Sequence, residues 1–363
     1  MLNNKTVAVV VPCFNEEKQI GGVLGTMPDF VDLIIVVNDQ SKDATLQKVK
    51  GFIANDTRGA RSFEKRVKSY SNGIYAGADN VALDIEKETE KLFIPYEVAS
   101  GMASRVILLT HSRNGGKGAS VATGYKYALD HALDCTAIMD GDGQMNPAEL
   151  ERVCTPIVTG QADYSKGNRF KHRNARQYMP PIRFYGNAIL SILTKIATGY
   201  WRVSDTQTGF TAISLEVLEN MEIHNLYPSY GVYNDILQKL NLANFTITEV
   251  PIAPVYNIGE KSKMNIFKVV PTISGLLIRR FFERLFIKYL FESFHPLFLL
   301  YMISFLTFLI DIPIIIQFLY AFVESGVIWS AHLTVLTSLL IFSFQSLVFA
   351  MWFDMHDNER LYI

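Results

Sequence analysis

The sequence of 363 residues predicts an α/β fold, with an open, mostly parallel sheet flanked by helices and followed by membrane-associated helices. Short β-branched runs at 6–11 and 33–37 are typical of buried strands, and a polar segment that can start a helix follows each of them. Strands that alternate with helices favour parallel pairing. Two long apolar segments within 295–353 predict the membrane-associated part.

The composition excludes some classes of protein. With 34 basic and 35 acidic side chains and a net charge of −1, the chain gives no argument for nucleic acid, and we expect none as a partner. Cys13, Cys135 and Cys154 form no CxxC pair, which predicts reduced thiols rather than disulfides or a zinc site. Residues 1–5 lead straight into a short apolar run, so we expect no signal peptide.

The first two strands each lead into a predicted helix. Residues 15–17 follow the strand at 6–11 and are expected to open a helix, because acidic side chains are favourable in a first turn. The strand at 33–37 ends in polar residues, and Asp43 is expected to cap the next helix.

Residues 51–104 break this rhythm, because polar and charged residues dominate without a strong period. We expect a helix followed by an inserted, surface-exposed excursion. It contains a basic run made of Arg58, Arg61, Lys65, Arg66 and Lys68. Such a run is usually a solvated face, and contact with lipid headgroups is the alternative.

A glycine-rich loop at 114–118 joins a predicted strand at 105–109 to a predicted helix at 119–133. It is not a Walker loop, because Gly118 follows Lys117 where Ser or Thr is required. Its glycines would let backbone amides approach an anion at the helix N-terminus. A plain strand-to-helix turn is the alternative.

Two carboxylates follow the next predicted strand, 136–139. Asp140 and Asp142 are separated only by Gly141. Ligands of open parallel sheets bind at the carboxyl ends of the strands, and carboxylates at such an end can share Mg²⁺ or Mn²⁺. A plain polar turn is the alternative. Asn146 and the proline after it are expected to start another helix.

The second half of the predicted domain adds polar clusters at 166–169 and 205–210. A helix is expected at 236–242 and a short strand at 245–250. The segment 259–263 is expected to be a flexible basic loop.

Residues 265–294 mix aromatic and aliphatic residues with Arg and Lys, which predicts amphipathic helices in the headgroup region. Ordinary helices packed on the globular domain are the alternative. The apolar segments 297–320 and 327–353 each exceed the roughly 20 residues that cross a bilayer. Because their link is short, we expect a transmembrane hairpin. Asp311 and Pro313 predict a kink or a re-entrant piece in the first span.

Basic residues at 279–288 precede the spans, so the positive-inside rule predicts an integral membrane protein whose preceding domain and both termini are cytoplasmic. A buried hairpin in a soluble protein is the alternative. The predicted division is a cytosolic domain at 1–260, juxtamembrane helices at 261–294, two transmembrane helices in 295–353 and a cytosolic tail at 354–363.

Seven short stretches, taken together and in order, resemble the family-two glycosyltransferases with the GT-A fold. More narrowly, the chain resembles the polyprenol-phosphate sugar transferases, which include the dolichol-phosphate mannosyltransferases. The resemblance implies a Rossmann-like mixed, mostly parallel sheet flanked by helices. The stretches are VPCFNEE (11–17), VVNDQSKDAT (36–45), RNGGKGASV (113–121), MDGDGQMNP (139–147), KGNRF (166–170), SDTQTGF (204–210) and GEKSKMN (259–265).

The resemblance also implies roles for individual residues. Asp140, Asp142 and Gln144, which include the Asp-x-Asp motif, would hold Mg²⁺ or Mn²⁺ and the diphosphate. Asp205 and Arg169 complete the catalytic set, with Arg169 and Lys263 on phosphate groups and Asp39 on the base. The residues expected to bind the nucleotide sugar are Pro12, Phe14, Asn15, Glu16, Val37, Asp39, Asn114, Lys117, Gly141, Gln144, Arg183 and Lys263.

The sequence departs from the family pattern at three positions. Asn38 stands where a second acidic residue is usual, Gln40 where glycine is common, and Asn257 where many members carry Arg. The excursion at 51–104 is also longer than expected. These departures concern the identity of the nucleotide more than the class of reaction.

The predicted reaction is inverting transfer of one sugar from a UDP- or GDP-linked donor to a polyprenyl phosphate at the membrane. A phosphate monoester with a second pKa of about 6 is already anionic near pH 7, so a general base is less necessary. A transferase for another glycolipid or for a polysaccharide and a non-catalytic membrane scaffold are the alternatives. The chain has no Gln-x-x-Arg-Trp motif of processive synthases, and its intact acidic set argues against a scaffold. The sequence leaves open whether the chain forms a homo-oligomer.

Overall fold

The computed structural model describes residues 1–59, 63–66, 76–101, 104–173, 179, 181–255, 266–326 and 330–363. The first half contains β1 (Val7–Cys13), α1 (Ile20–Gly25), β2 (Leu33–Asn38), α2 (Thr45–Asn55), α3 (Ala76–Glu90), β3 (Tyr96–Ser100), β4 (Val106–His111), α4 (Lys117–Asp130), β5 (Cys135–Ile138), η1 (Pro147–Glu149) and α5 (Leu150–Val158). The second half contains β6 (Tyr164–Asn168), α7 (Pro181–Thr198), β7 (Thr211–Ser214), α8 (Leu215–Asn220), η2 (Ile223–Asn225), α9 (Val232–Leu242), β8 (Ile247–Pro251), α10 (Ile266–Phe286), a π-helix η3 (Ile287–Glu292), α11 (Pro296–Ser325), α12 (Ser330–Asn358) and η4 (Glu359–Leu361).

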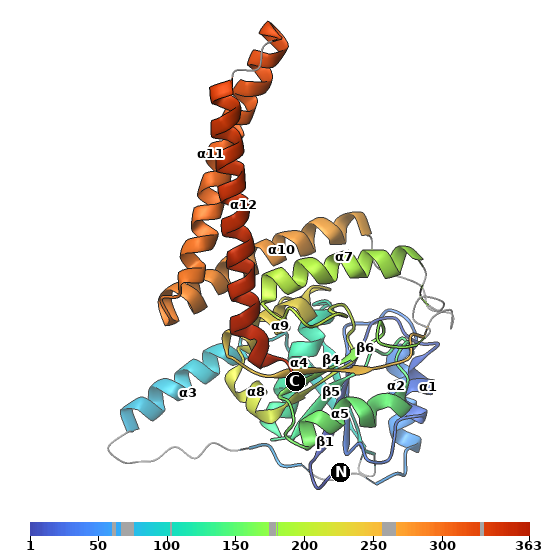
Figure 1. Ribbon diagram of the computed structural model, residues 1–363. Helices are drawn as coiled ribbons and strands as arrows, with labels where there is room; N and C mark the ends of the chain where they lie inside the picture. Colours follow the sequence, from blue (N-terminus) through green and yellow to red (C-terminus); the bar gives the residue numbers. More distant parts are fainter. Residues whose placement is uncertain are drawn as a thin grey trace.

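The strands form one sheet in the order β3-β4-β2-β1-β5-β7-β6-β8, with helices on both faces (Figure 1). Neighbours from β4 to β5 run parallel, as do β6 and β8, whereas β3, β7 and their neighbours pair antiparallel. The predicted fold class, a mixed and mostly parallel sheet flanked by helices, is confirmed.

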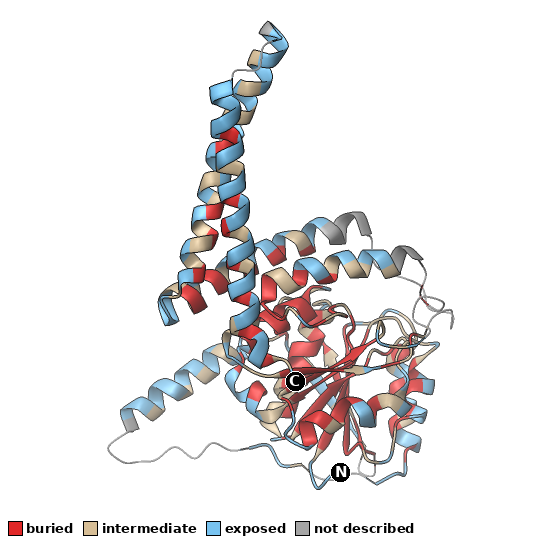
Figure 2. Ribbon diagram, viewed as in Figure 1, coloured by how far each residue is buried: buried red, intermediate tan, exposed pale blue. Residues whose placement is uncertain are grey.

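The two faces of the sheet carry separate apolar cores, because alternate residues of a strand point to opposite faces. Val10 and Ile35 pack with residues of α4, α8 and α9, whereas Val9 and Ile34 pack with residues of α1, α2 and α5. Both sides of the central strands are therefore buried (Figure 2). This explains why these strands read as continuous apolar runs in the sequence.

The first helix begins later than the sequence suggested. Asn15 has a left-handed backbone with φ of 56°, and α1 starts only at Ile20. Asp43 is also not the N-cap of α2, because Ala44 holds that position. The Asp43 carboxylate still accepts hydrogen bonds from the amides of Thr45 and Glu17, at 3.0 and 3.1 Å.

The region 51–104 contains more regular structure than expected. Helix α3 is followed by β3, which pairs antiparallel with β4 at the edge of the sheet. Within the described residues, the basic run is paired with carboxylates of the chain itself. Arg58 bonds Asp56 and Arg66 bonds Glu219, while Arg61 and Lys68 lie outside the described residues.

Helices α11 and α12 form the predicted hairpin (Figure 1). Both are long and apolar enough to cross a membrane, and most of their surface is exposed. Ser304 and Ser343 hold the two helices together, because each hydroxyl donates to the other residue's carbonyl oxygen at 3.0 Å. Helix α11 continues through Asp311 and Pro313 as a single helix, so the suggested re-entrant piece is wrong.

Helix α10 lies beside α7 and packs on the globular domain with one face (Figure 1). Its buried Arg284 forms an ion pair with Asp354 of α12, with nitrogen–oxygen distances of 2.6 and 2.7 Å, and donates to the carbonyl oxygen of Ala197. Lys288 Nζ donates hydrogen bonds to the side-chain oxygens of Asn241 and Asn358, at 3.1 and 3.0 Å. The end of the hairpin is therefore fixed to the domain through buried polar contacts.

Candidate active site

The predicted site residues that follow β1, β2, β4, β5 and β6 gather at the carboxyl ends of these strands. Asp39, directly after β2, lies at this edge and is 3% exposed. Its two carboxylate oxygens accept the amides of Gly115 and Gly116, both at 2.8 Å. The Nδ1 atom of His111, at the end of β4, is 2.8 Å from Oδ1. Asp39 therefore holds the glycine-rich loop in place, and a contact with a nucleotide base would come in addition to these three bonds.

The glycine-rich loop uses its amides internally. Besides the two held by Asp39, the amides of Gly118 and Ala119 donate to the carbonyl oxygen of Pro228, and that of Asn114 donates to Gln40. Gly116 has φ of 86°, which favours glycine. The predicted anion cradle is therefore wrong for these amides, and the loop is a strand-to-helix turn.

The segment after β1 interlocks with the segment after β2. The amide of Asn15 donates to Ser41 Oγ at 3.0 Å, and Asn15 Oδ1 accepts the amide of Lys42 at 2.7 Å. The amide of Glu16 donates to Thr45 Oγ1 at 2.8 Å. Phe14 and Glu16 are partly exposed beside these contacts, whereas the side chain of Val37 is fully buried within β2.

The acidic turn after β5 is short of positive partners. Lys117 Nζ lies 2.7 Å from Asp140 Oδ2, but the buried Oδ1 atom has no hydrogen-bond partner among the described residues. Asp142 accepts the amide of Gln144 at 2.9 Å. Burial and the neighbouring charge of Asp140 raise the pKa of Asp142 to about 6. A pair of neighbouring carboxylates, one with an oxygen that accepts no hydrogen bond from the described residues, fits a divalent cation.

Gly141 leaves no room for a side chain between these carboxylates. A Cβ atom there would lie 2.6 Å from Cys13 Sγ and 3.4 Å from the carbonyl oxygen of Pro12. The amide of Gly141 also donates to that oxygen, at 3.4 Å, which ties the turn to β1. In the described part of the chain, no group of three or more His, Cys, Asp or Glu side chains is arranged to hold a metal ion. Two carboxylates match Mg²⁺, which completes its coordination with water and substrate phosphates.

A second cluster surrounds Asp205, which is fully buried. Arg169 donates Nε and Nη2 to the two carboxylate oxygens at 2.7 and 2.9 Å, and its amide donates at 3.0 Å. Burial alone would raise the pKa of Asp205, but the charge and hydrogen bonds of Arg169 outweigh it and hold this pKa below its ordinary value. A carboxylate with these properties orients Arg169 and is a weak base.

Glu249 of β8 binds the backbone and side chains next to this cluster. Its buried side chain accepts the amides of Ser204 and Asp205 at 2.9 and 3.0 Å, and the side-chain amide of Asn168 at 2.8 Å. The backbone on both sides of the Arg169–Asp205 pair is thereby fixed.

Lys166 and Tyr233 lie between the two clusters. Lys166 is fully buried, donates to the carbonyl oxygen of Thr208, and lies 5.3 Å from the centre of the Tyr233 ring. Lys117 lies 5.1 Å from the centre of the same ring. Burial lowers the pKa of Lys166 to about 7. Sequence reasoning missed Lys166, Tyr233, His111 and Glu249, although the KGNRF stretch and the polar end of β4 pointed to two of these places.

For two predicted site residues, the structure describes no side chain. Arg183 lies in the first turn of α7, where only the backbone is described. Lys263 lies outside the described residues. Their expected contacts with the donor stay predictions.

Comparison with known proteins finds a family model and relatives that are similar to this chain. Residues 95–221 match the family model described as Glycosyl transferase family 2. The UDP-N-acetylglucosamine–dolichyl-phosphate N-acetylglucosaminyltransferase of Methanococcus voltae is 27% identical over 254 residues, which cover 70% of this chain and 87% of that protein. The polyprenol monophosphomannose synthase of Mycolicibacterium smegmatis is 26% identical over 163 residues, which cover 43% of this chain and 58% of the relative.

Among solved structures, the chain is similar to glucosyl-3-phosphoglycerate synthase from Mycobacterium tuberculosis in complex with uridine diphosphate. The identity is 19%, the TM-score is 0.47, and the match covers 77% of this chain and 80% of that one. A TM-score below 0.5 is too low to support the fold assignment, which depends on the strand order given above.

Proposed function

We propose that the chain transfers a single sugar from a UDP- or GDP-linked donor to a polyprenyl phosphate, because residues 95–221 match the Glycosyl transferase family 2 model. The observation that carries the proposal is the acidic turn, in which a buried carboxylate oxygen of Asp140, beside Asp142, has no hydrogen-bond partner among the described residues. The names of the two relatives, which include dolichyl phosphate and polyprenol, support the class of acceptor.

On the donor side, Asp140, Asp142 and Gln144 would hold Mg²⁺ or Mn²⁺. A bound divalent ion would spread the negative charge of the departing nucleoside diphosphate. Lys117, whose ammonium group now neutralises Asp140, would be free to face the diphosphate once a cation takes its place. Pro12 and Gly141 keep the two ends of this site together through their hydrogen bond.

On the acceptor side, Arg169 would bind the lipid phosphate while Asp205 fixes the guanidinium group. A phosphate oxygen of the lipid forms a bond to the anomeric carbon. The bond from that carbon to the diphosphate oxygen breaks, and its electron pair leaves with the nucleotide. The anomeric configuration is inverted. The lipid phosphate is anionic near pH 7, so this displacement needs no base, which agrees with the lowered pKa of Asp205.

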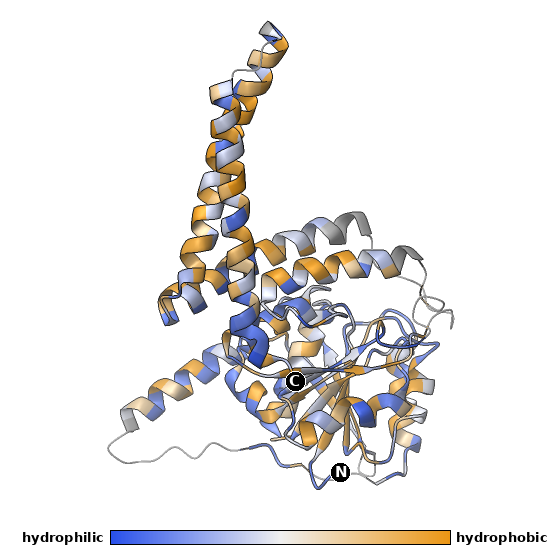
Figure 3. Cartoon of the chain, in the orientation of Figure 1, coloured by the Kyte–Doolittle hydropathy of each residue, from blue (hydrophilic) through white to orange (hydrophobic). Residues whose placement is uncertain are grey.

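The reaction would take place at the cytoplasmic membrane face, with α11 and α12 as transmembrane anchor, residues 261–294 as juxtamembrane helices and residues 1–260 as catalytic domain. Apolar side chains exposed on α7 and α10 support this placement, because the two helices lie side by side next to the domain-side end of the hairpin (Figure 3). These exposed apolar side chains recur every three or four residues along each helix. They are Tyr185, Ile189, Ile192 and Leu193 on α7, and Ile278, Phe282 and Phe286 on α10. We name this surface the apolar platform.

The proposal is tested with full-length protein in lipid vesicles. Undecaprenyl or dolichyl phosphate is added with Mn²⁺ and with labelled UDP-N-acetylglucosamine, UDP-glucose or GDP-mannose in turn. We expect one donor to place its label on the lipid phosphate as a single sugar, found in the organic extract. A longer glycan would favour the polysaccharide alternative, and the absence of transfer from every donor would favour the scaffold.

A further inference from the structure

The last residues of the chain return to the catalytic domain and extend its sheet. Tyr362 pairs with Ile247 of β8 in a parallel bridge, and the amide of Ile363 donates to the carbonyl oxygen of Ile247 at 3.0 Å. Thr248 Oγ1 donates to the carbonyl oxygen of Ile363 at 2.8 Å. Leu361 is 2% exposed and belongs to one of the two cores of the sheet. The segment 359–363, which we name the docked tail, is therefore a built part of the domain.

The docked tail carries one side chain toward the acceptor side of the candidate active site. Lys171 Nζ donates to the Tyr362 hydroxyl at 2.9 Å, and this hydroxyl donates to Glu249 Oε2 at 3.4 Å. Lys171 also lies 3.6 Å from the same carboxylate oxygen. Burial would lower the pKa of Lys171, but the hydrogen bond with Tyr362 and the charge of Glu249 raise it above its ordinary value.

Glu249 connects Tyr362 to the residues that would bind the lipid phosphate. Its other oxygen accepts the amides of Ser204 and Asp205, and Asp205 in turn orients Arg169. We propose that Tyr362 is a positioning residue for acceptor binding, which sets Glu249 and through it the Asp205–Arg169 pair. This inference rests on the proposed function, because it assigns Arg169 to the acceptor phosphate.

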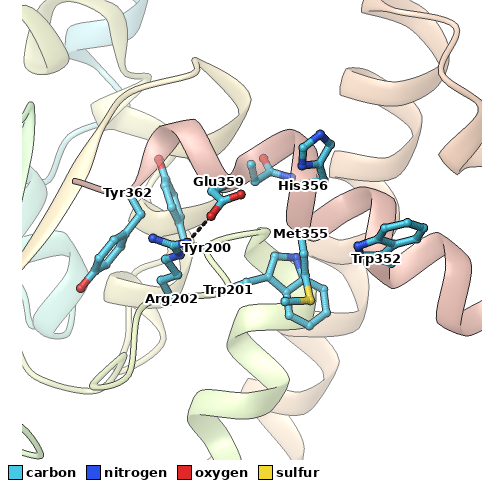
Figure 4. Close-up of a pocket in the computed structure, with 9 residues that line it drawn as sticks. Tyr200, Trp201, Arg202, Trp352, Met355, His356, Glu359 and Tyr362 are labelled. Atoms are coloured by element: carbon cyan, nitrogen blue, oxygen red, sulfur yellow. Dashed lines mark hydrogen bonds and ion pairs between the residues drawn. The ribbon is translucent and has the colours of Figure 1, made fainter.

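The docked tail also connects this site to the membrane hairpin. It follows directly from α12, and its Glu359 pairs with Arg202, three residues before Asp205 (Figure 4). Tyr200, Arg202, Trp352 and Tyr362 help to line a cavity of about 160 Å³ between the end of α12 and this loop. The docked tail thus contacts Arg202, three residues before Asp205, and Glu249, which accepts the amide of Asp205. The position of the hairpin would therefore be coupled to the position of Arg169.

The test compares full-length Tyr362→Phe, Lys171→Ala and the double variant with wild type in vesicles. Each variant is examined for transfer kinetics, thermal unfolding, and hydrogen–deuterium exchange at the amides of Ser204 and Asp205. For Tyr362→Phe we expect kcat/KM for polyprenyl phosphate to fall roughly fivefold to thirtyfold, with donor KM and unfolding midpoint unchanged. Exchange at the two amides should accelerate about tenfold. The double variant should be no worse than the more affected single variant, because the three groups act as one network.

The matched control is Arg360→Ala, which removes the tail contact with Asn244 Oδ1 at 3.2 Å but does not reach Glu249. It should behave as wild type. If wild type transfers sugar and Tyr362→Phe has normal kinetics, the inference is overturned, whatever the exchange rate. If wild type transfers no sugar, the proposed function fails, and unchanged exchange in Tyr362→Phe would overturn the coupling as well. A loss of activity in proportion to a lower unfolding midpoint would also contradict a positioning role.

Discussion

Two nitrogens of Arg169 donate to the two carboxylate oxygens of Asp205, at 2.7 and 2.9 Å, and this carboxylate is fully buried. The pairing favours a role for Asp205 in orienting the Arg169 guanidinium group over a role in removing a proton. The difference between these two roles can be measured.

The first prediction concerns Asp205→Asn. The variant should lose kcat and roughly 2 kcal/mol or more of stability, because the Arg169 charge loses its partner. The pH dependence of the remaining activity should keep the shape found for wild type, since Asp205 does not titrate in the reaction. Disappearance of an acidic limb from the profile, with stability preserved, would assign Asp205 the role of general base.

Lys166 gives a prediction on pH and stability. Its pKa of about 7 in the folded chain lies below the ordinary value of 10.5, so the unfolded chain binds more protons between these two values. Below pH 7 the buried ammonium group therefore lowers the free energy of unfolding by its full amount. As the pH rises from about 7 to 10.5 this destabilisation disappears, so the free energy of unfolding increases. Lys166→Met should remove this rise in unfolding midpoint. An equal slope in the two proteins between pH 7 and 9.5 would refute the assignment.

Gly141 and Cys13 give a prediction on packing. Gly141→Ala should cost about 1–3 kcal/mol and displace the flanking carboxylates, because its Cβ would lie 2.6 Å from Cys13 Sγ. Cys13→Ala removes that sulfur atom, so the double variant should regain much of the stability and activity lost by Gly141→Ala. Unfolding midpoints and transfer rates check both statements, and a double variant as impaired as the single one would show that Cys13 is not the obstacle.

The apolar platform gives a prediction on membrane contact. A fluorophore attached at Ile192→Cys of α7 should be quenched by spin-labelled lipid tails, because this side chain is expected to face the bilayer. Val81→Cys on α3, which is 60% exposed, is the matched control and should not be quenched. The three native cysteines are buried, so the label should be selective. Equal quenching at the two positions would contradict the platform.

The central strands could be predicted because burial on both faces requires a continuous apolar run. The two helices of the hairpin could be predicted because each is an apolar run long enough to cross a membrane. Strand β3 could not, because it is an edge strand in which Glu97, Val98 and Ser100 are exposed, and no apolar pattern results. The first helix begins later than predicted because the backbone of Asn15 is left-handed. The acidic residues next to Asn15 gave a helix-start signal that does not show this backbone conformation.

The candidate site shows the same division. The carboxylates at 140 and 142 could be found because an acidic pair after a short apolar run is a local pattern. Lys166 could not, because its burial comes from β7, β8 and Tyr233, all distant in sequence. The link from Tyr362 to Glu249 spans 113 residues and depends on where α12 ends, so only the folded chain shows it.

The measurement that tests the central claim most directly is transfer of labelled sugar to polyprenyl phosphate by wild type, Asp142→Ala and Asp142→Asn, first in EDTA and then in excess Mn²⁺. The account predicts that wild type transfers no sugar in EDTA and regains activity in Mn²⁺. Both variants, whose unfolding midpoints show that they are folded, stay at least 100-fold slower (about 2.7 kcal/mol in the activation barrier). Transfer that continues in EDTA, or that survives in either variant at a rate near wild type, would contradict it.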